Sequence, residues 1–270
     1  MSILKASILG LVQGLAEFLP ISSSGHLNLL EILLQVDIER QLLFNILLHV
    51  GTLAAVLAVF WREWVHMVAH PIKDRTLLLL VIASLPALAA KVLLGDQLDA
   101  LSTGNALLGV SFLFTGLLLT LTQWISQRKQ RADREQTQVG ALHALIMGCL
   151  QAVGMLPGVS RSGSTIFGGV ASGLDRKTAA KFSFLMSMPA ILASFLSEGY
   201  DAYKGGQLFQ TGDLAAVLIG MVVAAVSGYF AIRFFLRIIT KVSLNWFALY
   251  VVLLGIAVIV MQAMGIIAVI

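Results

Sequence analysis

Long, continuous apolar runs dominate the sequence and are the feature that most limits how it can fold. Six of them are long enough to cross a bilayer as helices, at about 1.5 Å of rise per residue: Leu42–Trp61, Thr76–Leu94, Asn105–Ile125, Ala179–Leu196, Leu214–Leu236 and Leu244–Ile267. The runs are unbroken rather than alternating, which favours helices over the strands of a barrel. Charged residues make up only 12% of the chain, about half the share found in soluble domains, so we expect an all-α polytopic membrane protein.

Two further apolar regions are interrupted by prolines and polar residues. The region Ile3–Leu34 contains Pro20 and a serine triplet, and the region Ala141–Leu174 contains Pro157 and Arg161. Each pattern predicts a short helix, a polar turn and a second short helix, which is typical of a re-entrant hairpin. The expected fold is therefore a single transmembrane domain over residues 1–270, with about six transmembrane helices plus two re-entrant helical hairpins.

The two hairpins resemble each other in sequence, which predicts an internal repeat. The segment that begins at Leu19-Pro20 parallels the one that begins at Leu156-Pro157, and Gln13 and Gln151 are separated by the same offset as Phe44 and Phe182. Each half, 1–135 and 136–270, then holds one hairpin and three spans. Because three is odd, the halves face opposite ways, as in the inverted-topology repeats of transporters.

The charged loops predict an orientation. Most of the 18 Lys and Arg residues lie in the loops around 62–75, 128–134, 176–181 and 233–241. The intervening loops are mainly acidic, with Asp37, Glu39, Asp96, Asp99, Glu198, Asp201 and Asp213. The positive-inside rule puts the basic loops in the cytoplasm and both termini outside. The basic loops account for the net charge of +4, so we expect no nucleic-acid partner. The N-terminal run is expected to be retained, since polar residues interrupt it and no cleavage site follows.

Glu17 and Arg161 are charges within apolar segments and need a reason to be there. Six hydroxyls accompany them, from Ser22, Ser23, Ser24, Ser160, Ser162 and Thr165, as do Gly25, Gly158 and Gly163. A new helix begins after each turn, and its N-terminus offers free N–H donors and positive potential. With the planar guanidinium this indicates a phosphate site. The alternatives are a purely structural ion pair and serines that only cap helices.

Glu17 has the wrong sign for a phosphate site unless it takes part in the chemistry. It shares a helix face with Gln13, and it could hold a divalent cation or act as a general acid or base. His26 follows Ser22 and Ser23 at helical spacing, which suggests an activated serine nucleophile, although a lone histidine is more often structural. His49 and Thr52 are further candidates for lining the site, and Lys91 is expected to snorkel at a helix end.

Two motifs together resemble those of the bacterial undecaprenyl pyrophosphate phosphatases of the bacitracin-resistance type. The first runs from Gln13 to His26 and matches (E/Q)xxxE followed by SS(S/T)GH, and the second runs from Pro157 to Thr165 and matches PGxSRSxxT. The resemblance covers essentially the whole chain. It implies hydrolysis of the C55 isoprenyl pyrophosphate to the monophosphate plus inorganic phosphate, which recycles the carrier lipid of peptidoglycan synthesis in cell-wall biogenesis, and bacitracin resistance on overproduction.

The resemblance also implies roles for residues at matching positions. Glu17 matches an essential acidic residue, Ser23 the proposed nucleophile, His26 a catalytic histidine and Arg161 the phosphate-binding arginine. A divalent cation, Mg²⁺ or Ca²⁺, is implied with Glu17 as its ligand; Gln13 stands where many relatives have Glu. The remaining polar motif residues would contact substrate: Gln13, Ser22, Ser24, Gly25, Ser160, Ser162, Gly163 and Thr165. The site would face the periplasmic side of the bacterial inner membrane. An anion transporter or lipid flippase using the same Arg and Ser residues is the alternative, and a homodimer is left open.

Overall fold

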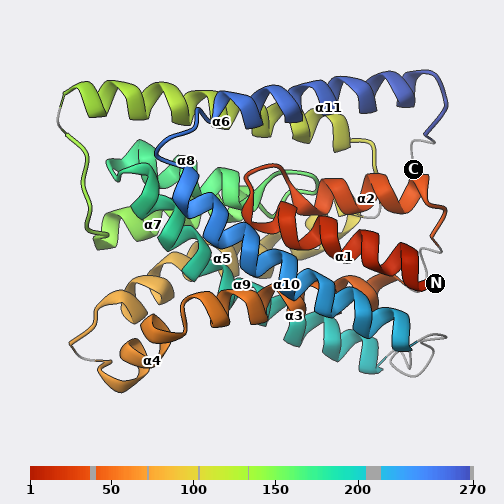
Figure 1. Cartoon of the computed structure of the whole chain (residues 1–270), viewed down its shortest axis with the longest axis horizontal. Helices are drawn as coiled ribbons and strands as arrows, with labels where there is room; N and C mark the ends of the chain where they lie inside the picture. The colour runs from red at the N-terminus through yellow and green to blue at the C-terminus, as the bar shows by residue number, and fades with distance from the viewer. Residues whose placement is uncertain (37–40, 72, 103, 133, 205–213, 268–270) are drawn as a thin grey trace.

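The computed structural model of the protein describes residues 1–36, 41–71, 73–102, 104–132, 134–204 and 214–267. Within these ranges the regular secondary structure is helical apart from one isolated bridge between Gln136 and Leu174, and turns and irregular segments connect the helices. The helices, shown in Figure 1, are α1 Ile3–Phe18, α2 Ser23–Leu33, α3 Gln41–Val59, α4 Trp61–Ala69, α5 Thr76–Ser102, α6 Leu108–Arg131, α7 Ala141–Val153, α8 Arg161–Ser172, α9 Arg176–Lys204, α10 Leu214–Ile238 and α11 Asn245–Ala263. The predicted all-α membrane architecture is confirmed.

The two interrupted regions each form a pair of short helices with a turn between them, as predicted. Helix α1 ends where Leu19 adopts an extended backbone, because the ring of Pro20 disfavours a helical conformation at the residue before it. Helix α2 then begins after Ser22, whose side chain accepts a hydrogen bond from the Gly25 N–H. Helix α8 begins in the same way after Ser160, which accepts from Gly163 N–H. Serine caps therefore fix where the second helix of each hairpin starts.

Five described helices are long and apolar enough to cross a membrane, and the bent pair α3 and α4 would make a sixth span. The first expected span, Leu42–Trp61, agrees with α3 and ends at a bend, where Phe44–Val59 and Trp61–Ala69 meet at 75°. Arg62 and Glu63 follow the bend, and charges of this kind favour leaving the apolar slab for the interface. Helix α5 runs to Ser102 rather than to Leu94, since hydropathy marks only the lipid-embedded part of a helix and not its polar extension.

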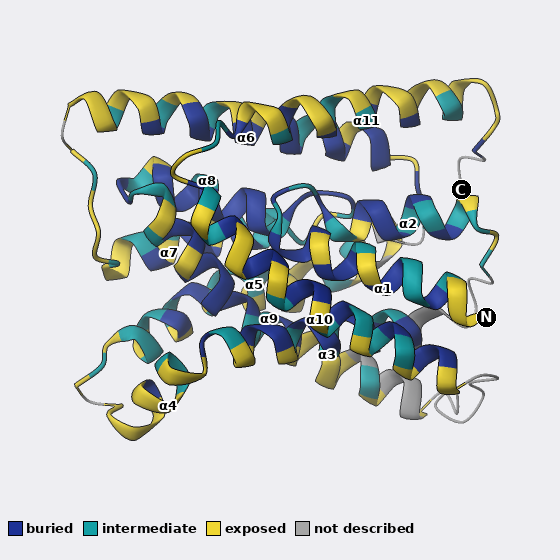
Figure 2. Ribbon diagram, viewed as in Figure 1, coloured by how far each residue is buried: buried dark blue, intermediate teal, exposed yellow. Residues whose placement is uncertain are grey.

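The helices pack so that the two hairpins meet inside the molecule. Helix α1 packs on α10, α5 packs on α7, and α6 lies along α11 to form an outer layer in Figure 1. Both termini lie at one end of the molecule, and α4 and the end of α6 lie at the other. The exposed residues form the outer faces in Figure 2, while buried residues gather where the hairpins meet. The acidic loop residues Asp37, Glu39 and Asp213 lie outside the described residues. Helices recur in matching order in the two halves, and the inverted repeat itself stays a prediction.

Small residues let α1 and α10 approach closely. A Cβ on Gly14 would contact the Ser227 side chain and would lie 2.5 Å from the backbone oxygen of Ala224 and 2.7 Å from the backbone nitrogen of Gly228. Close backbone approach of this kind is how small residues stabilise helix pairs in membranes, where no hydrophobic effect drives association. Helix α1 carries Glu17 in its last turn, so this contact also fixes the carboxylate in place.

We expect Gly14→Ala to lower the free energy of unfolding by about 2 kcal/mol, because overpacking against backbone atoms cannot be relieved by a side-chain rotation. Gly199→Ala is the matched control: its Cβ would have no atom within 4 Å, and removing a helical glycine stabilises by up to about 1 kcal/mol. Thermal unfolding in detergent measures both. Equal effects at the two positions would contradict the close packing of α1 on α10.

Candidate active site

An ion pair between the two hairpins lies at the centre of the molecule. The Arg161 guanidinium, at the first residue of α8, donates through Nη2 to Oε1 of Glu17, in the last turn of α1. The exposed fraction of the Glu17 side chain is 4%, and that of Arg161 is 18%. The two charges that the sequence singles out therefore meet, although they lie far apart in the chain, and each compensates the desolvation of the other.

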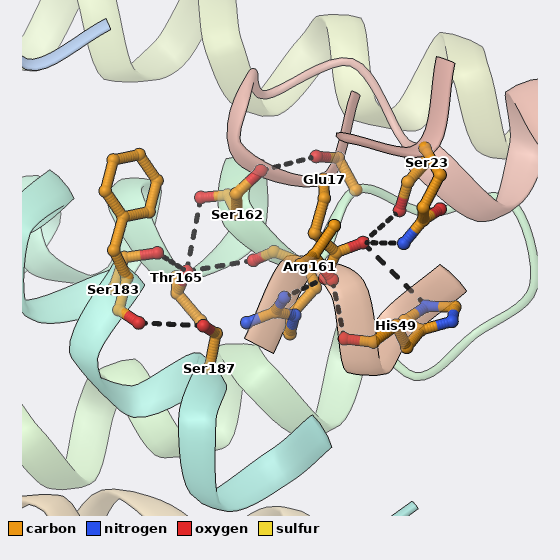
Figure 3. Close-up of polar contacts among 12 residues, drawn as sticks. Glu17, Ser23, His49, Arg161, Ser162, Thr165, Ser183 and Ser187 are labelled. Carbon is orange, nitrogen blue, oxygen red and sulfur yellow. Dashed lines mark hydrogen bonds and ion pairs between the residues drawn. The ribbon is translucent and has the colours of Figure 1, made fainter. Parts of the chain in front are cut away.

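The second oxygen of the Glu17 carboxylate gathers three further side chains, as Figure 3 shows. Oε2 accepts a hydrogen bond of 3.0 Å from Nε2 of Gln13 and one of 2.6 Å from the Ser23 hydroxyl. Nε2 of His49, on α3, lies 3.8 Å from the same oxygen. The carboxylate therefore connects an arginine, an amide, a hydroxyl and an imidazole from four helices.

Hydroxyl groups behind Arg161 tie α8 to its surroundings. Thr165 donates to the Arg161 carbonyl at 2.9 Å, and its Oγ1 lies 2.6 Å from Oγ of Ser183 on α9 (Figure 3). Ser162 donates to the Leu19 carbonyl of the other hairpin at 3.2 Å. Backbone N–H of Ser160 donates to Thr115 on α6 at 3.1 Å. These contacts orient the start of α8 and hence the guanidinium.

Glycines permit the turns to pack this tightly. A Cβ at Gly25 would lie 2.7 Å from the Phe112 ring and 3.0 Å from Oγ of Ser22, so a larger residue would disturb the cap of α2. Gly158 has φ +78°, a left-handed backbone that glycine adopts without the steric cost other residues incur. The turn before Arg161 thus requires its glycine for conformation as well as for space.

A cavity of about 810 Å³ lies beside the ion pair. Its wall combines apolar side chains from α5 and α9 with polar groups from both hairpins, α3 and α5. Its polar groups include Glu17, Ser23, Ser24, Asn45, His49, Lys91 and Arg161. An apolar cavity with a few convergent polar groups is the usual form of a small-molecule or lipid site.

The predicted site residues divide into two groups. Glu17, Ser23, Ser24 and Arg161 line the cavity wall. The others are buried around it without forming part of that wall: Gln13, Ser22, Gly25, His26, Ser160, Ser162, Gly163 and Thr165. In the structure Ser22 and Ser160 cap helices, which is the alternative considered for serines of this kind. Direct contact of this second group with substrate stays a prediction.

Helical spacing suggests that His26 faces the hydroxyl of Ser22 or Ser23, but the structure gives the imidazole other partners. Nδ1 of His26 lies 2.7 Å from the carbonyl oxygen of Ser22, and Nε2 lies 2.7 Å from the Tyr250 hydroxyl on α11. The ring stacks on Tyr250 and meets the Phe112 ring edge-on. Ser23 instead donates to Glu17. The Ser22 carbonyl one helical turn earlier and the Tyr250 and Phe112 rings of α11 and α6 together fix the direction of the imidazole.

Asn45 and Lys91 are among the cavity-lining polar residues to which the sequence pattern assigns no role in binding or chemistry. Asn45 precedes His49 by one turn on α3, and Lys91 lies well inside α5 rather than at a helix end. His49 lines the site, as the sequence predicts. Polar residues within apolar helices are the signal that points to such positions.

The residues around Glu17 fit a divalent cation of the hard, oxygen-preferring kind. Oε1 of Gln13 is buried and accepts no hydrogen bond, and it belongs to an amide bonded to the Glu17 carboxylate. The amide oxygen of Gln13, the carboxylate oxygens of Glu17 and the hydroxyl oxygen of Ser23 are three kinds of oxygen ligand. In the described part of the chain no group of three or more His, Cys, Asp and Glu side chains forms a metal cage. Mg²⁺ is usually bound by a few protein ligands together with phosphate oxygens of the substrate.

Comparison with known proteins gives a consistent result. The family model described as "Bacitracin resistance protein BacA" matches residues 6–257. The chain is 38% identical over 265 residues to an "Undecaprenyl-diphosphatase" of Carboxydothermus hydrogenoformans, with 98% of this chain and 99% of the relative covered. It is 41% identical to a protein of the same name from Treponema denticola, with 94% and 96% covered. A Bacillus thuringiensis "Undecaprenyl-diphosphatase 4" is 36% identical, with 97% and 98% covered.

We expect Arg161→Gln to lower the free energy of unfolding by about 3 kcal/mol, because it leaves a buried carboxylate without its partner charge. Glu17→Gln should destabilise for the converse reason. The double variant should lose less than the sum of the two single losses, since it buries neither charge. Chemical or thermal unfolding of the four proteins in one detergent gives the coupling energy. Strictly additive losses would show that the pair is not coupled.

Proposed function

The chain belongs to the bacitracin resistance protein BacA family, and on that premise we propose that it hydrolyses undecaprenyl diphosphate to undecaprenyl phosphate and inorganic phosphate. The observation that carries the proposal is the Glu17–Arg161 pair on the wall of an 810 Å³ cavity, with the Ser23 hydroxyl bonded to the same carboxylate. The Arg161 guanidinium, the Glu17 carboxylate, which can accept a proton, and the Ser23 hydroxyl meet beside a cavity large enough for a lipid head group. Phosphoryl transfer needs this combination of positioning and charge.

Binding of the diphosphate would use Arg161 and the start of α2. The guanidinium fork matches phosphate oxygens. Ser23 and Ser24, the first residues of α2, line the cavity, so the positive end of that helix dipole faces the same space. Leu88 and Val92 of α5 form part of the wall and suit an isoprenyl chain that stays in the bilayer.

The hydrolytic step would begin with Ser23 or with a water. In either case an O–P bond forms at the terminal phosphorus, the anhydride P–O bond breaks, and the electron pair leaves with the lipid monophosphate. The 2.6 Å hydrogen bond to Glu17 directs the Ser23 proton toward the carboxylate. Arg161 stabilises the charge that develops on the transferring phosphoryl group. If Ser23 attacks, a phosphoserine forms, and a water must then attack its phosphorus, so that the Oγ–P bond breaks, inorganic phosphate leaves and the serine hydroxyl is restored. A labelled phosphoserine would reveal this route, and it would be missing in Ser23→Ala.

A bound Mg²⁺ or Ca²⁺ would polarise the phosphoryl oxygens and neutralise their charge. Glu17, Gln13 Oε1 and Ser23 Oγ are the groups of this chain that would hold it. Since Glu17 supplies the only carboxylate of the three, substrate phosphates must supply the remaining charge.

Transport of an anion or a lipid is not favoured as the alternative, since the relatives are named as diphosphatases. The grouping of a hydroxyl, a carboxylate and an imidazole at one point also exceeds what anion passage requires. We further propose a location in the bacterial inner membrane with the site toward the outer side. Loop charges support this, because α4 and the basic end of α6 lie at the end of the molecule opposite the termini (Figure 1).

We expect the purified protein to release phosphate from a prenyl diphosphate in detergent, and Arg161→Gln to lower kcat/KM by at least about 100-fold, as loss of one transition-state donor does. Arg233→Gln is the matched control, since Arg233 is exposed on α10 and donates to Tyr229. Its rate should stay within about twofold of wild type. Absence of release with and without cation would overturn the function, and release from the cytoplasmic face of sealed vesicles would overturn the orientation.

We expect a chelator to abolish release and Mg²⁺ or Ca²⁺ to restore it. Gln13→Glu places a second carboxylate beside Glu17, and it should lower the cation concentration for half-maximal rate by about tenfold, equivalent to about 1.4 kcal/mol of binding. Titration of the chelated protein with Mg²⁺ measures this. An unchanged half-maximal concentration would show that the cation does not bind at Gln13 and Glu17.

A further inference from the structure

Helix α5 carries a lysine within its apolar span. At a rise of ~1.5 Å per residue, Lys91 lies about 22 Å from Thr76 and about 10 Å from Leu98, the two ends of the candidate span. Between Thr76 and Gly95 it is the only charged residue of the sequence. Ionisable residues at such depth are rare, because lipid solvates a charge poorly, and they usually face a cavity that serves a substrate or an ion.

The face of α5 that carries Lys91 forms part of the wall of the cavity beside the ion pair. The residues of α5 in that wall are Ser84, Ala87, Leu88, Lys91, Val92 and Leu98. Residues three, four and seven positions apart lie on one face of an α-helix, so Lys91 belongs to the face that α5 presents to the cavity. A ligand that fills the cavity therefore comes within reach of this long, flexible cation.

The charges of the cavity wall do not cancel. In the described part of the chain, Glu17, Lys91 and Arg161 are the Asp, Glu, Lys and Arg side chains of that wall. Arg161 is bonded to Glu17, so this pair contributes no net charge, and Lys91 makes the wall positive overall. A lipid diphosphate carries several negative charges, and lysine is a common ligand of phosphate. Lys91 thus supplies positive charge that the ion pair alone does not.

The neighbours of Lys91 indicate which of the two substrate phosphates it meets. Leu88 lies one turn before it and Val92 directly after it, and both belong to the cavity wall beside which the isoprenyl chain is proposed to lie. The phosphate that carries this chain must stay close to it. The terminal phosphate, in contrast, must lie beside Arg161 and Ser23 to be attacked. A lysine among the residues that contact the chain is therefore positioned for the lipid-linked phosphate.

We propose that Lys91 binds the lipid-linked phosphate and forms a second phosphate subsite, distinct from the terminal subsite at Arg161. The inference rests on the proposed function. As the attacking oxygen bonds to the terminal phosphorus, the anhydride P–O bond breaks and its electron pair stays on the lipid-linked phosphate. The ammonium of Lys91 stabilises the charge of this leaving group. The lipid monophosphate that results keeps the same contact, so Lys91 also raises the affinity for the product.

The test compares a prenyl monophosphate with the prenyl alcohol of the same chain length, since the two ligands differ only in the phosphate. The stabilisation that each gives against thermal unfolding in detergent measures its affinity without catalysis. Lys91→Met keeps an unbranched side chain and loses the charge, so affinity for the monophosphate should fall about tenfold and affinity for the alcohol should stay unchanged. Lys177→Met is the matched control, because Lys177 is exposed at the start of α9 and lies outside the cavity wall. Both of its affinities should equal those of wild type.

Hydrolysis of a prenyl diphosphate supplies the second measurement. Lys91→Met should raise KM and lower kcat/KM by at least about tenfold, and Lys91→Arg, which keeps the charge, should recover most of the loss. An inactive wild type would overturn the proposed function, and the thermal measurements would still decide whether Lys91 binds the phosphate. Unchanged affinity of Lys91→Met for the monophosphate, or an equal loss for the alcohol, would overturn the subsite. Size-exclusion chromatography checks folding, and Lys91→Gln replaces Lys91→Met if that variant is not monodisperse.

Discussion

Burying a carboxylate and a guanidinium inside a membrane protein is the constraint on which the rest of this structure depends. Either charge alone would cost several kcal/mol in such surroundings. The hairpins bring Glu17 and Arg161 together from opposite halves of the chain. Gln13 and Ser23 satisfy the remaining carboxylate oxygen, and serine caps start both second helices. The glycine contacts of α1 with α10 hold the carboxylate end in place. Polar groups that stabilise the pair are thus also the groups that can perform chemistry.

Much of the fold could be predicted because local chemistry determines it. Proline after Leu19, and serine caps before Gly25 and Gly163, determine the two hairpins without reference to distant contacts. The end of α5 was less predictable. Hydropathy does not show that a helix continues beyond its apolar region, as α5 does to Ser102. The inverted relation of the halves remains a prediction.

The meeting of Glu17 with Arg161 could be predicted because unpaired charges are too costly in lipid. The side chains that His26 and His49 contact could not be predicted in this way. Helical spacing placed His26 near Ser22 and Ser23, but Tyr250, from the other end of the chain, fixes its ring. His49 reaches Glu17 through the packing of α3 on α1 and α10, which spacing within one helix does not reveal. The sequence pattern therefore identifies the important residues more readily than it identifies the contacts between them.

Helix α5 is the least buried of the candidate spans, yet Leu88 and Val92 belong both to its exposed surface and to the cavity wall. The cavity is thus bounded on one side by a single layer of side chains adjoining the lipid. A long-chain substrate arriving there diffuses in two dimensions, and its effective concentration is its mole fraction in the bilayer. Turnover should accordingly respond to dilution by other lipids or by detergent, and KM values should be expressed per lipid rather than per volume of water.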